Sequence, residues 1–156
     1  MSEQAVTVGQ EAPDFTLRDE NNQEVTLSAL RGQPVMIAFY PFAFSGVCQG
    51  EMCEIRDAWP DFLATGAKVL AISRDSRFAL KAWKDQQNFQ HTLLADTKGD
   101  VAKKYGAWNE QVGAAERLSV VVGKDGKVTY VTRSENLGTP RDQKQALAAL
   151  QAAAKA

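Results

Sequence analysis

The stretch Ala38–Cys53, AFYPFAFSGVCQGEMC, joins an apolar run to a segment with helical spacing. The apolar run, residues 35–40, predicts a buried strand that ends at Pro41. After Cys48 the apolar residues recur at steps that fit one buried helical face: Met52, Ile55, Trp59, Phe62 and Leu63. The stretch therefore predicts a strand, a loop and then a helix from about Ser45 to Ala64, with Cys48 in the first helical turn.

The place of Cys48 in that first turn indicates a reactive thiol. Free backbone N–H groups at a helix N-terminus and the helix dipole both stabilise an anion. A cysteine held there ionises more readily and attacks as a thiolate. Cys48 is therefore the candidate nucleophile. The alternative is that it is a small buried apolar residue.

The composition is that of an ordinary globular domain. With 156 residues, 44% of them hydrophobic, the chain can bury a full core, and we expect one domain over residues 1–156. A formal net charge of −1 and the lack of a basic run argue against nucleic acid or an anionic membrane as partner. The N-terminal residues show no signal-peptide pattern, so we expect a cytoplasmic protein. Two cysteines in that reducing compartment favour a catalytic or redox role.

The rest of the chain alternates between strand and helix patterns. Short alternating segments at 15–17 and 25–27, around a turn at 19–22, predict an N-terminal β-hairpin. Further elements are expected in this order: a buried strand at 68–73, a helix capped by Asp75 or Ser76 and ending near Gln87, a strand at 91–95, a short helix at 100–105, a hairpin of strands 118–122 and 128–131 with Asp125-Gly126 at its turn, and a last helix that Thr139-Pro140 opens. This order predicts an α/β fold with a central mixed β-sheet flanked by helices.

The run Pro41–Cys48, PFAFSGVC, matches Pro-x-x-x-Thr/Ser-x-x-Cys, the active-site motif of the peroxiredoxins. Further similar features are APDFTL at 12–17, Ile72–Asp75, and Arg117 before a Val-rich strand. The sequence therefore resembles the peroxiredoxin family over nearly the whole chain. The resemblance implies a thioredoxin-like fold and a thiol peroxidase that reduces hydrogen peroxide, alkyl hydroperoxides or peroxynitrite. It implies no metal, haem or flavin, because sulfur carries the chemistry.

The resemblance also assigns roles to the residues around Cys48. The Ser45 hydroxyl would hydrogen-bond the thiolate or the peroxide, and the Arg117 guanidinium would stabilise both. Pro41 would shield the pocket from water, and Glu51 would support this network or the helix N-terminus. Two alternatives remain: Ser45 as a helix N-cap, and Arg117 as a surface residue at a strand start.

Cys53 forms a Cys-x-x-x-x-Cys pair with Cys48. That spacing resembles the peroxiredoxin Q (bacterioferritin comigratory protein) type, whose second cysteine resolves the sulfenic acid as a disulfide. Cys48–Glu51, CQGE, looks more like the alkyl hydroperoxidase E type, which often works with one cysteine. Five residues along a helix separate two Cα atoms by roughly 8–9 Å, and a disulfide needs about 7 Å or less, so resolution requires the helix start to unwind. Gly50 weakens the helix there. The alternative is a core-facing Cys53.

Several rival functions and partners follow from these features. A thiol–disulfide oxidoreductase would need Cys-x-x-Cys, which the chain lacks, whereas a redox-sensing or chaperone-like binding protein could use the same cysteine switch. His91, the only histidine, is expected to be structural, and no zinc-ligand set is present. The resemblance implies thioredoxin, a glutaredoxin-like protein or a small thiol as reductant. Phe44 either packs inward or contributes to a homodimer.

Overall fold

The computed structural model describes residues 5–156 and is built on a seven-stranded mixed sheet with the order β2-β1-β5-β4-β3-β8-β9. The strands β3, β4 and β5 run parallel, and the other pairings in this sheet are antiparallel. The elements are β1 Thr16–Asp19, β2 Glu24–Thr26, the 3-10 helix η1 Leu27–Leu30, β3 Val35–Phe39, α1 Gly46–Asp57, α2 Trp59–Ala64, β4 Lys68–Ser73, α3 Arg77–Gln87, β5 Thr92–Ala95, α4 Asp100–Lys104, β6 Trp108–Asn109, β7 Ala114–Ala115, β8 Leu118–Val122, β9 Val128–Arg133 and α5 Gln143–Lys155. The predicted α/β architecture and its N-terminal hairpin are confirmed.

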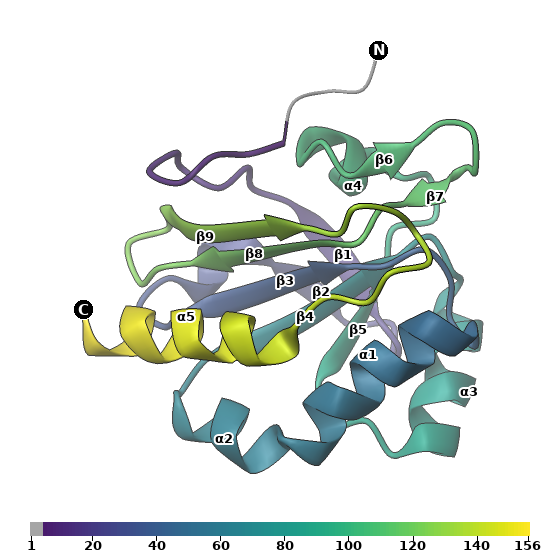
Figure 1. Cartoon of the computed structure of the whole chain (residues 1–156), viewed down its shortest axis with the longest axis horizontal. Coiled ribbons are helices and arrows are strands. Elements are labelled where there is room, and N and C mark those ends of the chain that lie inside the picture. The colour runs from purple at the N-terminus through teal and green to yellow at the C-terminus, as the bar shows by residue number, and fades with distance from the viewer. Residues whose placement is uncertain (1–4) are drawn as a thin grey trace.

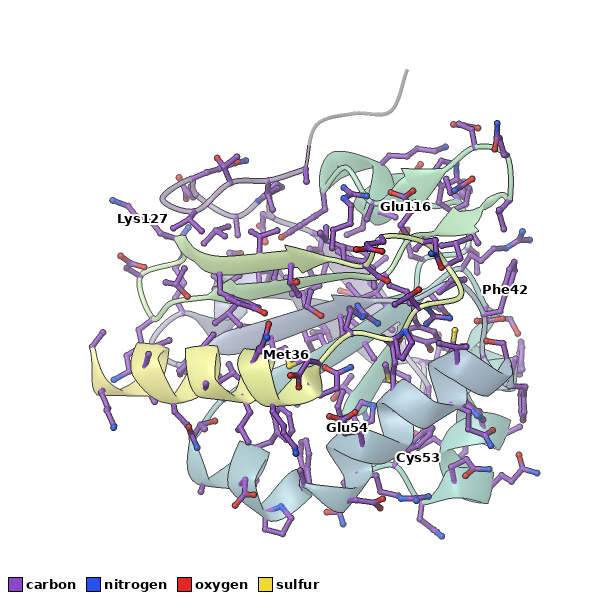
Figure 2. All side chains as sticks on the ribbon, viewed as in Figure 1. Met36, Phe42, Cys53, Glu54, Glu116 and Lys127 are labelled. Carbon is purple, nitrogen blue, oxygen red and sulfur yellow. The ribbon has the colours of Figure 1, made fainter. Side chains whose placement is uncertain are left out.

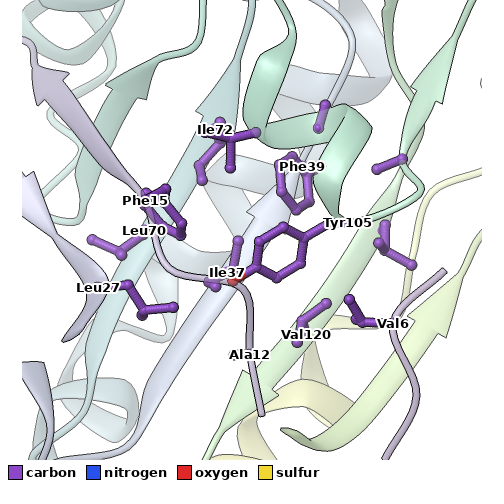
Figure 3. Close-up of a cluster of buried hydrophobic side chains, with 14 of the residues drawn as sticks. Val6, Ala12, Phe15, Leu27, Ile37, Phe39, Leu70, Ile72, Tyr105 and Val120 are labelled. Carbon is purple, nitrogen blue, oxygen red and sulfur yellow. The ribbon is translucent and has the colours of Figure 1, made fainter. Parts of the chain in front are cut away.

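Two hydrophobic cores lie on opposite faces of the sheet. Figure 1 shows α1, α2, α3 and α5 below the sheet, with α4, the β6–β7 pair and the N-terminal segment above it. The central strand β3 alternates between these cores, with Met36, Ala38 and Tyr40 facing the first group and Val35, Ile37 and Phe39 facing the second. Figure 3 shows the second core, where the Tyr105 ring lies 5.4 Å from Phe39 and 6.1 Å from Phe15, centroid to centroid.

The predicted helix from Ser45 to Ala64 is in fact two helices. α1 ends at Asp57, and α2 begins at Trp59 after a break at Ala58. Pro60 accounts for the break, because it has no N–H to donate and its ring would clash with the carbonyl of residue 56 in a continuous helix. The apolar spacing predicted one helix because α2 keeps Phe62 on the same buried side.

The predicted start of the last helix at Thr139-Pro140 is also wrong. α5 begins at Gln143, and the Asp142 carboxylate accepts the Lys144 N–H at 2.9 Å as its N-cap. Arg141 is held outside the helix because its backbone N–H donates to Glu51 Oε2 at 2.7 Å. The alternative caps for α3 are resolved in favour of Ser76, whose hydroxyl accepts the Ala79 N–H. The two-residue strands β6 and β7 are too short to show a sequence period.

The sheet brings three chain segments to one edge. Phe39, the last residue of β3, pairs with Ile72 near the end of β4 and with Leu118 at the start of β8. The loop before α1, the segment after β4 and Arg117 before β8 therefore meet at the carboxyl end of β3. Among the described residues, none of the helices is long and apolar enough to cross a membrane.

Candidate active site

Cys48 is the third residue of α1 and is fully buried. The first-turn N–H groups of Gly46, Val47 and Cys48 have no partner one turn earlier in the helix, so the dipole is directed toward this thiol. The Gln49 N–H closes the first turn by donating to the Ser45 carbonyl at 2.8 Å. The Gln49 side chain accepts the Trp83 indole N–H at 3.1 Å, which fixes this turn to α3.

The loop from Pro41 to Ser45 connects β3 to α1. Pro41 is buried, as expected for a residue that keeps water from the thiol. Ser45 takes the N-cap position of α1, but its side chain makes no capping hydrogen bond. Its hydroxyl instead donates to the Phe42 carbonyl at 3.0 Å. In this arrangement its single proton is donated to the loop backbone.

Arg117 extends from the start of β8 to the second turn of α1. Only 3% of it is exposed, so it is not a surface residue. Its Nη1 donates to Glu51 Oε1 at 2.6 Å, and its Nε donates to the Leu137 carbonyl at 2.7 Å. Its Nη2 makes no hydrogen bond with any of residues 5–156. Arg117 is thus bound to Glu51, which lies three residues after Cys48 in α1, and its Nη2 is left to donate.

Glu51 joins two arginines in a buried network. Arg141 donates to Oε2 from its backbone N–H at 2.7 Å and from Nε at 2.9 Å, and to Oε1 from Nη2 at 2.8 Å. Its Nη1 donates to the Ser119 hydroxyl at 3.2 Å. Burial would raise the pKa of Glu51, but the hydrogen bonds and charge of Arg141, with the charge of Arg117, outweigh burial and hold it below its ordinary value. Glu51 is therefore a carboxylate that orients both guanidinium groups.

Tyr40 and His91 are buried polar residues outside this network. The Tyr40 hydroxyl has no hydrogen-bond partner among residues 5–156. Burial raises its pKa, and the charges of Asp75 and Cys48 act in the same direction, so it keeps its proton. Burial lowers the pKa of His91 to about 3, and its ring lies 5.3 Å from that of Phe89. A neutral histidine in an aromatic core is consistent with a structural role.

Cys53 lies apart from Cys48 although both belong to α1. Both cysteines are free thiols, and α1 is continuous through both positions. The Cys53 Sγ lies 3.7 Å from Gln87 Oε1, and Gln87 also accepts Arg56 Nη1 through its carbonyl at 2.9 Å. Figure 2 shows Phe42 beside the start of α1 and Cys53 further along the helix. This compact form does not pair the cysteines, and the resolving role of Cys53 stays a prediction.

Comparisons of this chain with family models and with known proteins agree on one family. A model of the AhpC/TSA family matches residues 8–131, most of the chain. The chain belongs to the AhpC/TSA peroxiredoxin family.

The relatives of this peroxiredoxin include both types that the sequence resembles. Alkyl hydroperoxide reductase E of Mycobacterium tuberculosis is 42% identical over 153 residues, which cover 94% of this chain and 99% of that protein. Chloroplastic peroxiredoxin Q of Oryza sativa subsp. japonica is 34% identical over 131 residues, covering 83% of this chain and 60% of that protein. The crystal structure of Enterococcus faecalis AhpC is 25% identical, with a TM-score of 0.85 over 93% of this chain and 90% of that one. The chain is accordingly a thiol peroxidase with a thioredoxin-like fold.

Sequence reasoning missed Arg141 in this peroxiredoxin. The residue stands ninety positions from Glu51, between Pro140 and the cap of α5, and nothing in that local pattern marks a buried cation. An arginine before a helix cap is usually solvated, and this one is 6% exposed. Only the packing of α5 against α1 and β8 shows that it completes the Glu51 network.

Replacement of Arg141 by Met should destabilise the protein by about 3 kcal/mol, because Glu51 would lose its Nε and Nη2 partners while remaining buried. Glu51 stabilises the fold above its unfolded-state pKa of about 4.3, and this contribution is lost as pH falls through its lower folded pKa. With Arg141 gone, burial of Glu51 is less compensated and its folded pKa rises toward or above the unfolded value. Acidification should therefore cost the variant less stability than it costs the wild type, so the difference between the two proteins narrows as pH falls. Urea unfolding of both proteins from neutral pH to well below the unfolded-state pKa measures both effects.

Arg18→Met is the matched control, because the Arg18–Glu24 ion pair lies at the surface with the arginine side chain 53% exposed. Its loss should change the free energy of unfolding by less than about 0.5 kcal/mol. Equal effects of the two substitutions would show that the buried network contributes no more than a surface pair.

Proposed function

We propose that Cys48 is the peroxidatic nucleophile and that this peroxiredoxin reduces hydrogen peroxide, alkyl hydroperoxides and peroxynitrite. The observation that carries this proposal is that buried Arg117 binds Glu51, the residue three positions after Cys48 in α1, and that its Nη2 has no partner among residues 5–156. Cys48 lies at the start of α1, where the helix favours an anion. Pro41 and Ser45 belong to the loop that leads from β3 into this helix.

The reaction is a displacement on oxygen. The Cys48 thiolate attacks one peroxide oxygen, an S–O bond forms as the O–O bond breaks, and the electron pair leaves with the second oxygen. From hydrogen peroxide or an alkyl hydroperoxide, that oxygen takes up a proton and departs as water or an alcohol, and from peroxynitrite it departs as nitrite, while the sulfur is oxidised to a sulfenic acid. Negative charge moves from sulfur to the departing oxygen, so a donor that follows this charge lowers the barrier.

We assign one role to each of four residues: Arg117, Ser45, Pro41 and Glu51. Arg117 Nη2 donates to the peroxide and stabilises the charge on the departing oxygen. Ser45 turns its hydroxyl from the Phe42 carbonyl toward the sulfur or the peroxide when substrate binds. Pro41 keeps water out, which strengthens these interactions in a medium of low dielectric. Glu51 acts by orienting Arg117 and does not transfer a proton.

Single-turnover stopped-flow oxidation by hydrogen peroxide tests this function. The wild type should react rapidly and turn over with a thiol reductant, and Cys48→Ser should abolish the reaction. Arg117→Met should lower the second-order rate constant by about 100-fold, because one transition-state donor is lost. Arg18→Met, which changes an exposed arginine, should react as the wild type does. Slow stoichiometric oxidation of the wild type without turnover would contradict the enzyme and favour a redox sensor.

We also propose that Cys53 resolves the Cys48 sulfenic acid after the first turns of α1 unwind. The rival is a one-cysteine enzyme that an external thiol recycles, as the similarity to alkyl hydroperoxide reductase E suggests. Gly46 and Gly50 support unwinding, since glycine weakens a helix by about 1 kcal/mol relative to alanine. The sulfenic acid and the Cys53 thiol then condense to a disulfide with loss of water.

Mass analysis after one equivalent of peroxide, without added thiol, distinguishes the two modes. Resolution predicts a protein that is lighter by two hydrogens, with a peptide linking Cys48 to Cys53. Cys53→Ser should instead stop at the sulfenic acid, which dimedone would trap. Trapping of the sulfenic acid in the wild type at the same yield as in Cys53→Ser would exclude intramolecular resolution.

The wider setting is proposed from the same similarities. We infer a single peroxiredoxin domain over residues 1–156, acting in the cytoplasm. Its reductant is thioredoxin, a glutaredoxin-like protein or a small thiol, each of which can reduce a sulfenic acid or a disulfide. No cofactor enters the reaction above, because the sulfur supplies both electrons.

A homodimer through the loop of Phe44 is proposed on the exposure of that residue, which is 49%. An exposed aromatic ring beside a catalytic loop is typical of a contact surface. Phe44→Asp should convert a dimer to a monomer in sedimentation velocity. Leu63→Asp, at another exposed apolar residue on α2, should leave the dimer intact. A monomer-sized wild type would contradict the proposal.

A further inference from the structure

The segment that follows β4 contacts the catalytic loop at successive residues. Asp75 Oδ2 accepts the backbone N–H of Ala43 at 2.8 Å. The guanidinium of Arg74 lies 6.0 Å from the ring centroid of Phe42, and its Nη1 donates to the Gly113 carbonyl at 2.9 Å. Asp75 therefore connects the loop to the end of β4 through its hydrogen bond to Ala43. Arg74, the residue before Asp75, lies beside the ring of Phe42, the residue before Ala43.

We propose that Asp75 is a positioning residue for peroxide reduction: by holding the Ala43 N–H, it fixes the loop that carries Pro41 and Ser45 next to Cys48. This inference rests on the proposed peroxidase function of Cys48. Asp75 does not touch the reacting atoms and acts through the loop backbone.

The hydrogen bond between the Ala43 N–H and Asp75 distinguishes Ala43 from its neighbours in the loop. Within the described part of the chain, Ala43 is the only one of residues 42–45 whose backbone N–H has a hydrogen-bond partner. The ends of the loop are fixed elsewhere, by the Tyr40 N–H on the Ile72 carbonyl and by the first turn of α1. Between these ends, Asp75 supplies the backbone contact that sets the path of the loop.

The conformation of Phe44 explains why the loop needs such a contact. Phe44 has a φ of 68°, in the left-handed region that a bulky side chain rarely adopts. A residue in that region persists only where its surroundings impose it. Asp75 accepts the backbone N–H of Ala43, the residue before Phe44, and the centroid of the Trp83 ring lies 5.9 Å from that of the Phe44 ring. Loss of the Asp75 contact would let Phe44 relax and displace Ser45, the next residue.

A carboxylate is well suited to this position. The same oxygen, Oδ2, also accepts the Ser73 hydroxyl at 2.6 Å, and Ser73 is buried at the end of β4. The Ser73 hydroxyl at the end of β4 thus fixes the carboxylate of Asp75, and the same carboxylate binds the loop at Ala43. Because one oxygen accepts both bonds, an asparagine can reproduce them with its amide oxygen, whereas an alanine removes both.

The test compares Asp75→Ala and Asp75→Asn with the wild type, using two reactions of Cys48. Asp75→Ala should slow single-turnover reduction of hydrogen peroxide by about 100-fold, the effect expected of misplaced reacting groups. The same variant should react with iodoacetamide at least as fast as the wild type, because a loosened loop exposes the sulfur. Asp75→Asn should stay within about threefold of the wild type in both reactions. Because general unfolding would also slow peroxide reduction and expose the buried sulfur, the far-UV circular dichroism and urea unfolding midpoint of Asp75→Ala should match those of Asp75→Asn.

Hydrogen exchange of the Ala43 amide reports the contact itself. It should be slow in the wild type and in Asp75→Asn and fast in Asp75→Ala. If Asp75→Ala does not fold, Ser73→Ala removes the hydroxyl that donates to the Asp75 carboxylate and accepts the Asp75 N–H, and it should slow the peroxide reaction and speed Ala43 exchange.

The outcomes separate this inference from the proposed function. A wild type that reduces peroxide rapidly, with Asp75→Ala or the substitute Ser73→Ala equally fast, would overturn the positioning role and leave the peroxidase intact. Equal slowing in Asp75→Asn and Asp75→Ala would also overturn it, because charge and not the accepted bond would then matter. A wild type that does not reduce peroxide would overturn the function itself.

Discussion

The fold of this site depends on the buried Glu51 carboxylate and the two guanidinium groups bound to it. Glu51 belongs to α1, Arg117 precedes β8 and Arg141 precedes α5, so one side chain joins three segments that are distant in the sequence. A carboxylate buried this deeply is stable only because four N–H donors satisfy it. The orientation of α1, and with it the place of Cys48, therefore depends on this network.

The network also explains the electrostatics of the site. One carboxylate and one guanidinium would cancel, whereas the second guanidinium leaves a net charge of +1 beside the first two turns of α1. This charge and the helix dipole act in the same direction on an anion at Cys48. Arg141 thus keeps Glu51 paired by itself, so the substrate contact proposed for Arg117 would not leave the carboxylate without a cation.

Local patterns in the sequence were sufficient for the strand, the loop and the start of the helix around Cys48, although they missed the break at Ala58. The peroxiredoxin motif pointed to Pro41 and Ser45, and the wider resemblance pointed to Arg117. The continuous apolar run of β3 and the Asp-Gly turn of the late hairpin are local signals, and both elements were predicted from them. Arg141 and Asp75 were not, because their partners are ninety and thirty-two residues away and no spacing rule connects them. The late start of α5 has the same origin, since Glu51 binds the backbone of Arg141 outside the helix.

The order of residues in α1 adds a constraint on the redox cycle. Glu51 lies between Cys48 and Cys53, so unwinding that extends past Gly50 would disturb the turn that the two arginines hold. Unwinding confined to Gly46–Gly50 would leave Glu51 in place and free Cys48 to approach Cys53. Unwinding beyond Glu51 would separate a buried carboxylate from its cations, at a cost of several kcal/mol. Intramolecular resolution therefore requires the short route, and the glycines at 46 and 50 lie at its two ends.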